Sequence, residues 1–154
     1  MEIKTNIHAE EGKQELIITR EFDLPVDLLF TAYTDPEVIE QWMGTKVIRL
    51  ENQKHGSYHF QTTDPHGNKY NFNGTIHDFI PDKKIIRTFE FENVPLDVQL
   101  EFLSYESLGS HRSKLTMHIV YKSIEIRDNV LKMPFAHGIN MAHNRLQQIM
   151  NNKK

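Results

Sequence analysis

The chain has 154 residues, with 18 basic and 21 acidic side chains, a formal net charge of −3 with its histidines neutral, and no cysteine. The lack of cysteine excludes disulfides, iron–sulfur clusters, thiolate metal sites and cysteine nucleophiles. The near balance of charge argues against nucleic-acid binding, which requires clustered positive side chains. No window is apolar over the roughly 18 residues that a membrane span needs, and the first residues lack the apolar centre of a secretory signal. We therefore expect one cytoplasmic domain covering residues 1–154.

The first part of the chain predicts a hairpin followed by two short helices. Residues 14–22 (QELIITREF) alternate polar and apolar side chains after a turn-like segment, and a weaker alternating run covers 3–8. Pro25 suits the first turn of a helix, in which apolar residues recur at helical spacing as far as Thr34. The segment 35–44 predicts a second helix, because it begins with an Asp-Pro pair and ends with glycine.

Residues 45 to about 121 alternate with a period close to two and are interrupted by turn sequences that delimit six strands. This pattern predicts an antiparallel meander with one apolar and one polar face. Glu101 and Gln99 fall on the polar face, with His59, His77 and His118. The expected apolar face comprises Tyr58, Phe60, Tyr70, Phe72, Ile76, Ile85, Phe89, Phe91, Val98, Leu100, Phe102, Leu115, Met117, Ile119 and Tyr121.

The C-terminal segment returns to helical periodicity. A first stretch around Ile124 and Val130 precedes Pro134, and an apolar stripe then runs from Phe135 to Met150 at spacings of three and four. Such a helix must cover an apolar surface. The expected fold class is therefore α+β, a curved antiparallel sheet of six to seven strands wrapped around a long C-terminal helix, with two short helices after the first strand.

Short motifs along this order of elements match a known family. They are Ile18 to Phe22, Pro25 through Thr34-Asp35-Pro36, Glu40-Gln41-Trp42, Gly56-Ser57-Tyr58-His59-Phe60, Asp64-Pro65-His66-Gly67, Gly74, Pro81, Thr88-Phe89-Glu90, Asp128, Gly138 and Arg145-Leu146. With them the chain resembles the START-like (SRPBCC) helix-grip superfamily, in the branch of the C-terminal domain of the activator of heat-shock protein 90 ATPase. Two positions depart from that pattern, because Met43 and Ile139 stand where relatives commonly have tryptophan, which removes aromatic area.

The resemblance implies a cavity between the sheet and the C-terminal helix that holds a lipid, a polyketide or another hydrophobic small molecule. From the residues alone, the alternative is a core that packs without a cavity. The expected lining is mostly apolar with a few polar groups, as in ligand pockets generally, and Trp42 is expected near the mouth. The candidate ligand-binding residues are Trp42, Tyr58, Phe60, Phe72, Arg87, Phe89, Phe102, Met117, Phe135 and Ile139.

Arg87 is the sharpest single feature, since alternation places this cation on the apolar face of its strand. An unpaired buried charge is costly, so the side chain must reach an opening or meet an acceptor. One hypothesis places Arg87 near the cavity entrance, orienting an anionic or carbonyl-bearing ligand. The other pairs it with a nearby Asp or Glu, or lets it reach solvent at a strand edge.

The histidines do not predict a metal site. His55 and His59 are separated by a turn, and His137 and His143 are six residues apart on a helix, on different faces. Phosphate-loop, dinucleotide and nucleophile-elbow motifs are missing, so we expect no cofactor and assign no catalytic residue.

A non-enzymatic binding protein is therefore the first interpretation. Two alternatives stay open: a stress-response protein that associates with a chaperone through a surface around Trp42 and Met43, and a cyclase-like or hydrolase-like enzyme. For an enzyme, Tyr58, Tyr70 and Arg87 are the candidates for acid–base roles. The six methionines leave a homodimer open as well.

Overall fold

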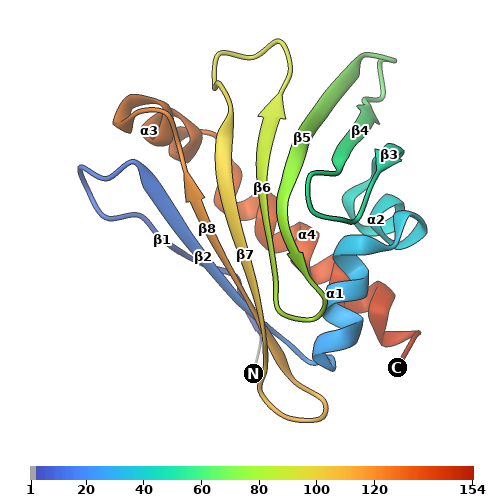
Figure 1. The fold of residues 1–154 in the computed structure, drawn as a ribbon. Coiled ribbons are helices and arrows are strands. Elements are labelled where there is room, and N and C mark those ends of the chain that lie inside the picture. Colours follow the sequence, from blue (N-terminus) through green and yellow to red (C-terminus); the bar gives the residue numbers. More distant parts are fainter. Residues whose placement is uncertain (1–2) are drawn as a thin grey trace.

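A computed structural model describes residues 3–154 and shows a sheet that wraps around one face of a long helix (Figure 1). The strands are β1 (Asn6–His8), β2 (Glu15–Phe22), β3 (Lys46–Leu50), β4 (Ser57–Thr63), β5 (Lys69–Ile80), β6 (Lys84–Phe91), β7 (Gln99–Ser107) and β8 (Ser113–Val120). The helices are α1 (Val26–Thr34), α2 (Pro36–Met43), α3 (Ile124–Lys132) and α4 (Phe135–Asn151).

All strands described by the structure belong to one antiparallel sheet of eight strands, in the order β1-β2-β8-β7-β6-β5-β4-β3. β2 therefore pairs with the last strand, β8, while β1 lies at one edge of the sheet and β3, the first strand of the meander, lies at the other. Figure 1 shows α4 running across one face of this sheet, with α1 and α2 beside its C-terminal half. The α+β class and the two short helices after the first long strand are confirmed, and the short β1 brings the sheet to eight strands.

Capping chemistry sets the limits of α2 as the sequence indicates. The Asp35 side chain accepts a hydrogen bond from the Glu37 amide at 3.0 Å, and Pro36 occupies the first turn. Gly44 ends the helix with φ of 63°, a left-handed conformation that glycine adopts without steric cost. These local bonds place Trp42, near the end of α2, against the core.

The facing of β7 differs from the sequence prediction. Val98, Leu100 and Phe102 were expected on the apolar inner face, but Glu101, Leu103 and Tyr105 are the buried residues of this strand, at 4%, 1% and 5% exposure. The Phe102 ring instead packs 5.5 Å from His118 on the other face. The prediction failed because β7 has apolar residues in both sets of alternating positions. The sequence pattern therefore does not define which set faces inward.

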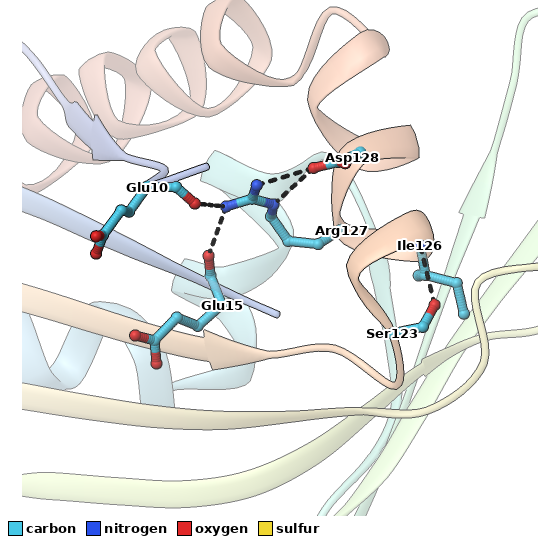
Figure 2. A network of polar contacts seen from close by, with 6 residues as sticks. All are labelled: Glu10, Glu15, Ser123, Ile126, Arg127 and Asp128. Atoms are coloured by element: carbon cyan, nitrogen blue, oxygen red, sulfur yellow. Dashed lines mark hydrogen bonds and ion pairs between the residues drawn. The ribbon is translucent and has the colours of Figure 1, made fainter. Parts of the chain in front are cut away.

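Helix α3 is fastened to the N-terminal hairpin by a buried arginine (Figure 2). Arg127 is 2% exposed, and its Nη1 donates to the carbonyl oxygens of Glu10 at 2.9 Å and Glu15 at 3.2 Å. Its Nε and Nη2 donate to the Asp128 carboxylate at 3.0 and 2.8 Å. At the start of the helix, the Ser123 hydroxyl accepts from the amide of Ile126 at 3.1 Å. This network fixes the helix that forms one end of the cavity described below.

Candidate ligand-binding cavity

A cavity of about 460 Å³ lies between the inner face of the sheet and helices α2, α3 and α4. Its walls are mostly aromatic and aliphatic, with a few polar groups from β6, β7, α1 and α4. It is lined by Tyr33, Ile39, Trp42, Met43, Phe60, Phe72, Arg87, Phe89, Phe91, Leu96, Asp97, Gln99, Glu101, Met117, Ile119, Tyr121, Val130, Met133, Phe135, Gly138, Ile139, Ala142 and His143.

Most of the candidate ligand-binding residues come together in this lining. Trp42, Phe60, Phe72, Arg87, Phe89, Met117, Phe135 and Ile139 are all part of it. Tyr58 is not, because its ring lies behind the wall, 5.1 Å from the Arg87 guanidinium carbon, and its hydroxyl donates to the Thr88 carbonyl at 2.5 Å. Phe102 is not either, since it faces the opposite side of the sheet.

The sequence analysis expected Trp42 near the mouth of the cavity, but the opening lies elsewhere. Trp42 is 4% exposed, and its indole N–H donates to the Ala32 carbonyl at 2.7 Å, so this ring forms an inner wall. The exposed members of the lining are Asp97, Met133 and Gly138. They place the opening between the β6–β7 loop and the N-terminal end of α4. The burial of Trp42 also means that it offers no aromatic surface for a chaperone.

Arg87 is paired within the wall of the cavity. Register sets it directly opposite Glu101 on the neighbouring strand. Its Nε donates to Glu101 Oε1 at 2.9 Å, with the two side chains only 11% and 5% exposed. The second carboxylate oxygen of Glu101 accepts from Gln99 Nε2 at 2.8 Å. Of the two hypotheses for this arginine, the structure supports pairing with a carboxylate.

A second polar group lies where α4 meets α1 and the N-terminal segment. His143 is 1% exposed, with Nδ1 2.7 Å from the Thr5 hydroxyl and Nε2 3.4 Å from the Tyr33 hydroxyl. Burial, together with the positive charge of Arg20, lowers the pKa of His143 to about 3, so the imidazole is neutral near pH 7. Burial also raises the pKa of the Tyr33 hydroxyl, which stays protonated.

Sequence reasoning missed Tyr33, Glu101 and His143 as cavity residues. Glu101 was assigned to the polar face because the sequence analysis chose the wrong set of alternating residues of β7 as the inward-facing set. His143 was considered only as a metal ligand. One signal could have identified Glu101. An inward-facing Arg87 requires a hydrogen-bond acceptor, and Glu101 is the carboxylate on the neighbouring strand that pairs with it in register. Tyr33 and His143 show no such local signal, because they come together only through tertiary packing.

Two further expectations concern residues away from the cavity. Tyr70 is 39% exposed and its hydroxyl donates to the Asp64 carboxylate at 3.2 Å, so it does not belong to the site. Over residues 3–154, the structure groups no three His, Asp or Glu side chains in a way that could hold a metal ion. None of the helices in that part of the chain combines the length and the hydropathy that crossing a bilayer requires.

Comparison with known families assigns this architecture. Residues 23–151 match the family described as activator of Hsp90 ATPase homolog 1-like protein. The chain belongs to this family. A search among curated proteins finds no match.

Solved structures with the same helix-grip fold include three bacterial proteins at low sequence identity. A protein from Rhodobacter sphaeroides gives a TM-score of 0.87 at 20% identity, covering 97% of this chain and 99% of that one. Protein Ms6760 from Mycobacterium smegmatis gives 0.84 at 22% identity, covering 97% of each chain. A protein from Arthrobacter aurescens gives 0.84 at 18% identity, covering 96% of this chain and 91% of the other. Likeness at these identities establishes the fold.

Proposed function

We propose that this member of the family binds a hydrophobic small molecule in the cavity between the sheet and α4. The observation that carries the proposal is the cavity itself, whose volume of about 460 Å³ falls within the range typical of ligand sites. An apolar wall interrupted by a few polar groups is the usual composition of such sites. Family membership fits a ligand-binding helix-grip fold.

We infer binding without catalysis, because the buried carboxylate and the buried imidazole of the wall are already engaged. Both carboxylate oxygens of Glu101 accept hydrogen bonds, from Arg87 and from Gln99. Both ring nitrogens of His143 have hydroxyl partners, and its low pKa makes it a weak base. A general acid or base must reach the proton that it transfers, which these contacts oppose. Association with a chaperone stays a prediction.

A thermal-shift screen with uncharged lipids, polyketides and flavonoids tests the proposal. A ligand at a hundred times its dissociation constant stabilises the folded state by about 2.7 kcal/mol, which corresponds to a rise in Tm of about 5–10 °C for a domain of this size. A compound identified in this way should also shift the NMR methyl signal of Met117, which lines the cavity.

A matched pair of α4 variants separates the cavity from the surface. Ile139→Trp adds a ring inside the cavity, whereas Met141→Trp adds the same ring at a position that is 43% exposed. We expect the first variant to lose ligand stabilisation and the second to retain it. A panel in which no compound raises Tm, or an Ile139→Trp variant that binds as well as the parent, would contradict the proposal.

A further inference from the structure

The lining of the cavity carries more negative than positive formal charge. Among its described residues, the charged side chains are Arg87, Asp97 and Glu101. Asp97 lies at the opening, where Lys122 is its partner at 3.5 Å. His143 adds no positive charge, because burial keeps its imidazole neutral near pH 7. Arg87 is therefore the cation of the wall, and the pairing of its guanidinium decides which ligand charge the cavity accepts.

The guanidinium of Arg87 is occupied on two sides. Glu101 accepts from its Nε at 2.9 Å, and the face of the Tyr58 ring lies 5.1 Å from its central carbon. Gln99 holds the other oxygen of Glu101 in place. A ligand carboxylate that approached Arg87 would share this cation with a buried carboxylate, and like charges in a medium of low dielectric constant repel strongly.

We propose that Glu101 determines ligand charge, so that the cavity selects uncharged molecules bearing hydroxyl or carbonyl groups over carboxylates with the same carbon skeleton. This inference rests on the proposed binding function and concerns the class of ligand. The lining offers such a molecule uncharged polar partners, among them the hydroxyls of Tyr33 and Tyr121. A neutral tyrosine hydroxyl can donate or accept a hydrogen bond without requiring a charged partner.

The test compares probes of equal length at pH 8, where a fatty acid is ionised. Binding of 1-decanol, methyl decanoate and decanoate is measured by displacement of the uncharged dye Nile red and by direct calorimetry. Any apolar cavity favours the alcohol over the ion to some extent, so the decisive quantity is the change in this preference on removing the charge of Glu101. Glu101→Gln keeps the shape of the side chain and leaves Arg87 without a counter-charge.

We expect Glu101→Gln to increase the affinity for decanoate relative to decanol at least tenfold. Glu106→Gln, which removes the same charge from an exposed position on the same strand, should leave the ratio as in the parent protein. A parent protein that binds decanoate as tightly as decanol, or a Glu101→Gln variant with an unchanged ratio, would overturn the inference while leaving the binding function in place. Absence of binding by every probe and by the dye would instead remove the binding function and this inference with it.

A second variant covers the case in which Glu101→Gln does not fold, because an unpaired buried arginine is destabilising. The double variant Arg87→Gln with Glu101→Gln removes both charges. We expect its preference among the probes to equal that of the parent, since the pair is already neutral. A tenfold loss of decanoate binding in the double variant would show that Arg87 holds the ligand carboxylate, which is contrary to the inference.

Discussion

Gly74 on β5 occupies a position where any side chain would meet the neighbouring strands. It pairs with Tyr58 of β4. A Cβ added at Gly74 would lie 2.0 Å from the carbonyl oxygen of Thr88 and 2.7 Å from the hydroxyl of Tyr58. The first atom belongs to the backbone of β6, so it cannot rotate away as the end of a side chain can. Gly74→Ala must therefore separate β5 from β6 or distort both strands.

The expected cost of Gly74→Ala is about 3 kcal/mol in the free energy of unfolding. Overpacking of a buried site costs about 1–3 kcal/mol, and the displaced bond from Tyr58 to the Thr88 carbonyl, 2.5 Å long, adds roughly 1 kcal/mol. For a domain of this size, a loss of about 3 kcal/mol lowers Tm by about 6–12 °C. The strain should also weaken ligand binding, because Tyr58 supports the Arg87 guanidinium.

Gly138→Ala is the matched control for this prediction. A Cβ at Gly138, within α4, meets no atom within 4 Å. Alanine is a better helix former than glycine by about 1 kcal/mol, so this variant should be more stable than the parent. Urea and thermal unfolding of both variants measure the difference. A Gly74→Ala variant within about 1 kcal/mol of the parent would refute the steric argument.

Further substitutions test three other contacts, those of Tyr105, His143 and Arg127. Among the described residues, the hydroxyl of Tyr105 is the only buried side-chain oxygen or nitrogen without a hydrogen-bond partner, so Tyr105→Phe should raise the free energy of unfolding by about 1 kcal/mol. Tyr58→Phe should lower it by about the same amount, because it removes the bond to the Thr88 carbonyl; parallel urea titrations measure both. Because burial lowers the folded-state pKa of His143 to about 3, below its unfolded value of about 6.5, the unfolded state binds the extra proton between these values. The free energy of unfolding should therefore fall by up to about 1.4 kcal/mol per pH unit as the pH drops through this window. His143→Gln should reduce this pH dependence in urea titrations at several pH values. An unchanged pH dependence would argue against a neutral buried imidazole. Arg127→Met should cost about 3 kcal/mol, because it removes a buried guanidinium that donates to two backbone carbonyls and to a carboxylate. Arg112→Met breaks an exposed ion pair and should cost less than about 1 kcal/mol; equal losses would contradict the role assigned to the network in Figure 2.

Local signals in the sequence were sufficient for most of the secondary structure. The cap formed by Asp35 and Pro36, the stop at Gly44 and the apolar stripe of α4 each depend on residues close together in the chain. These contacts form wherever the local sequence permits, so their positions can be predicted without knowledge of the rest of the fold. The polar groups of the cavity wall depend on contacts between residues that are far apart in the chain.

Glu101 and His143 show what local patterns leave undetermined. A strand such as β7, with apolar residues in both phases, takes the facing that satisfies its neighbours, and here the buried Arg87 required a carboxylate opposite it. His143 becomes a neutral group because packing brings it beneath Tyr33 and excludes water.

Periodicity and turn chemistry were thus enough to specify an α+β chain with one apolar sheet face and a long covering helix, since both follow from the spacing of side chains along the backbone. Tertiary structure alone decided that sheet and helix enclose a cavity of about 460 Å³ and that its buried arginine is already neutralised. The cavity depends on the distance between the curved sheet and the straight helix, and the neutralisation of Arg87 depends on which strand lies beside β6. Both involve residues that are distant in sequence.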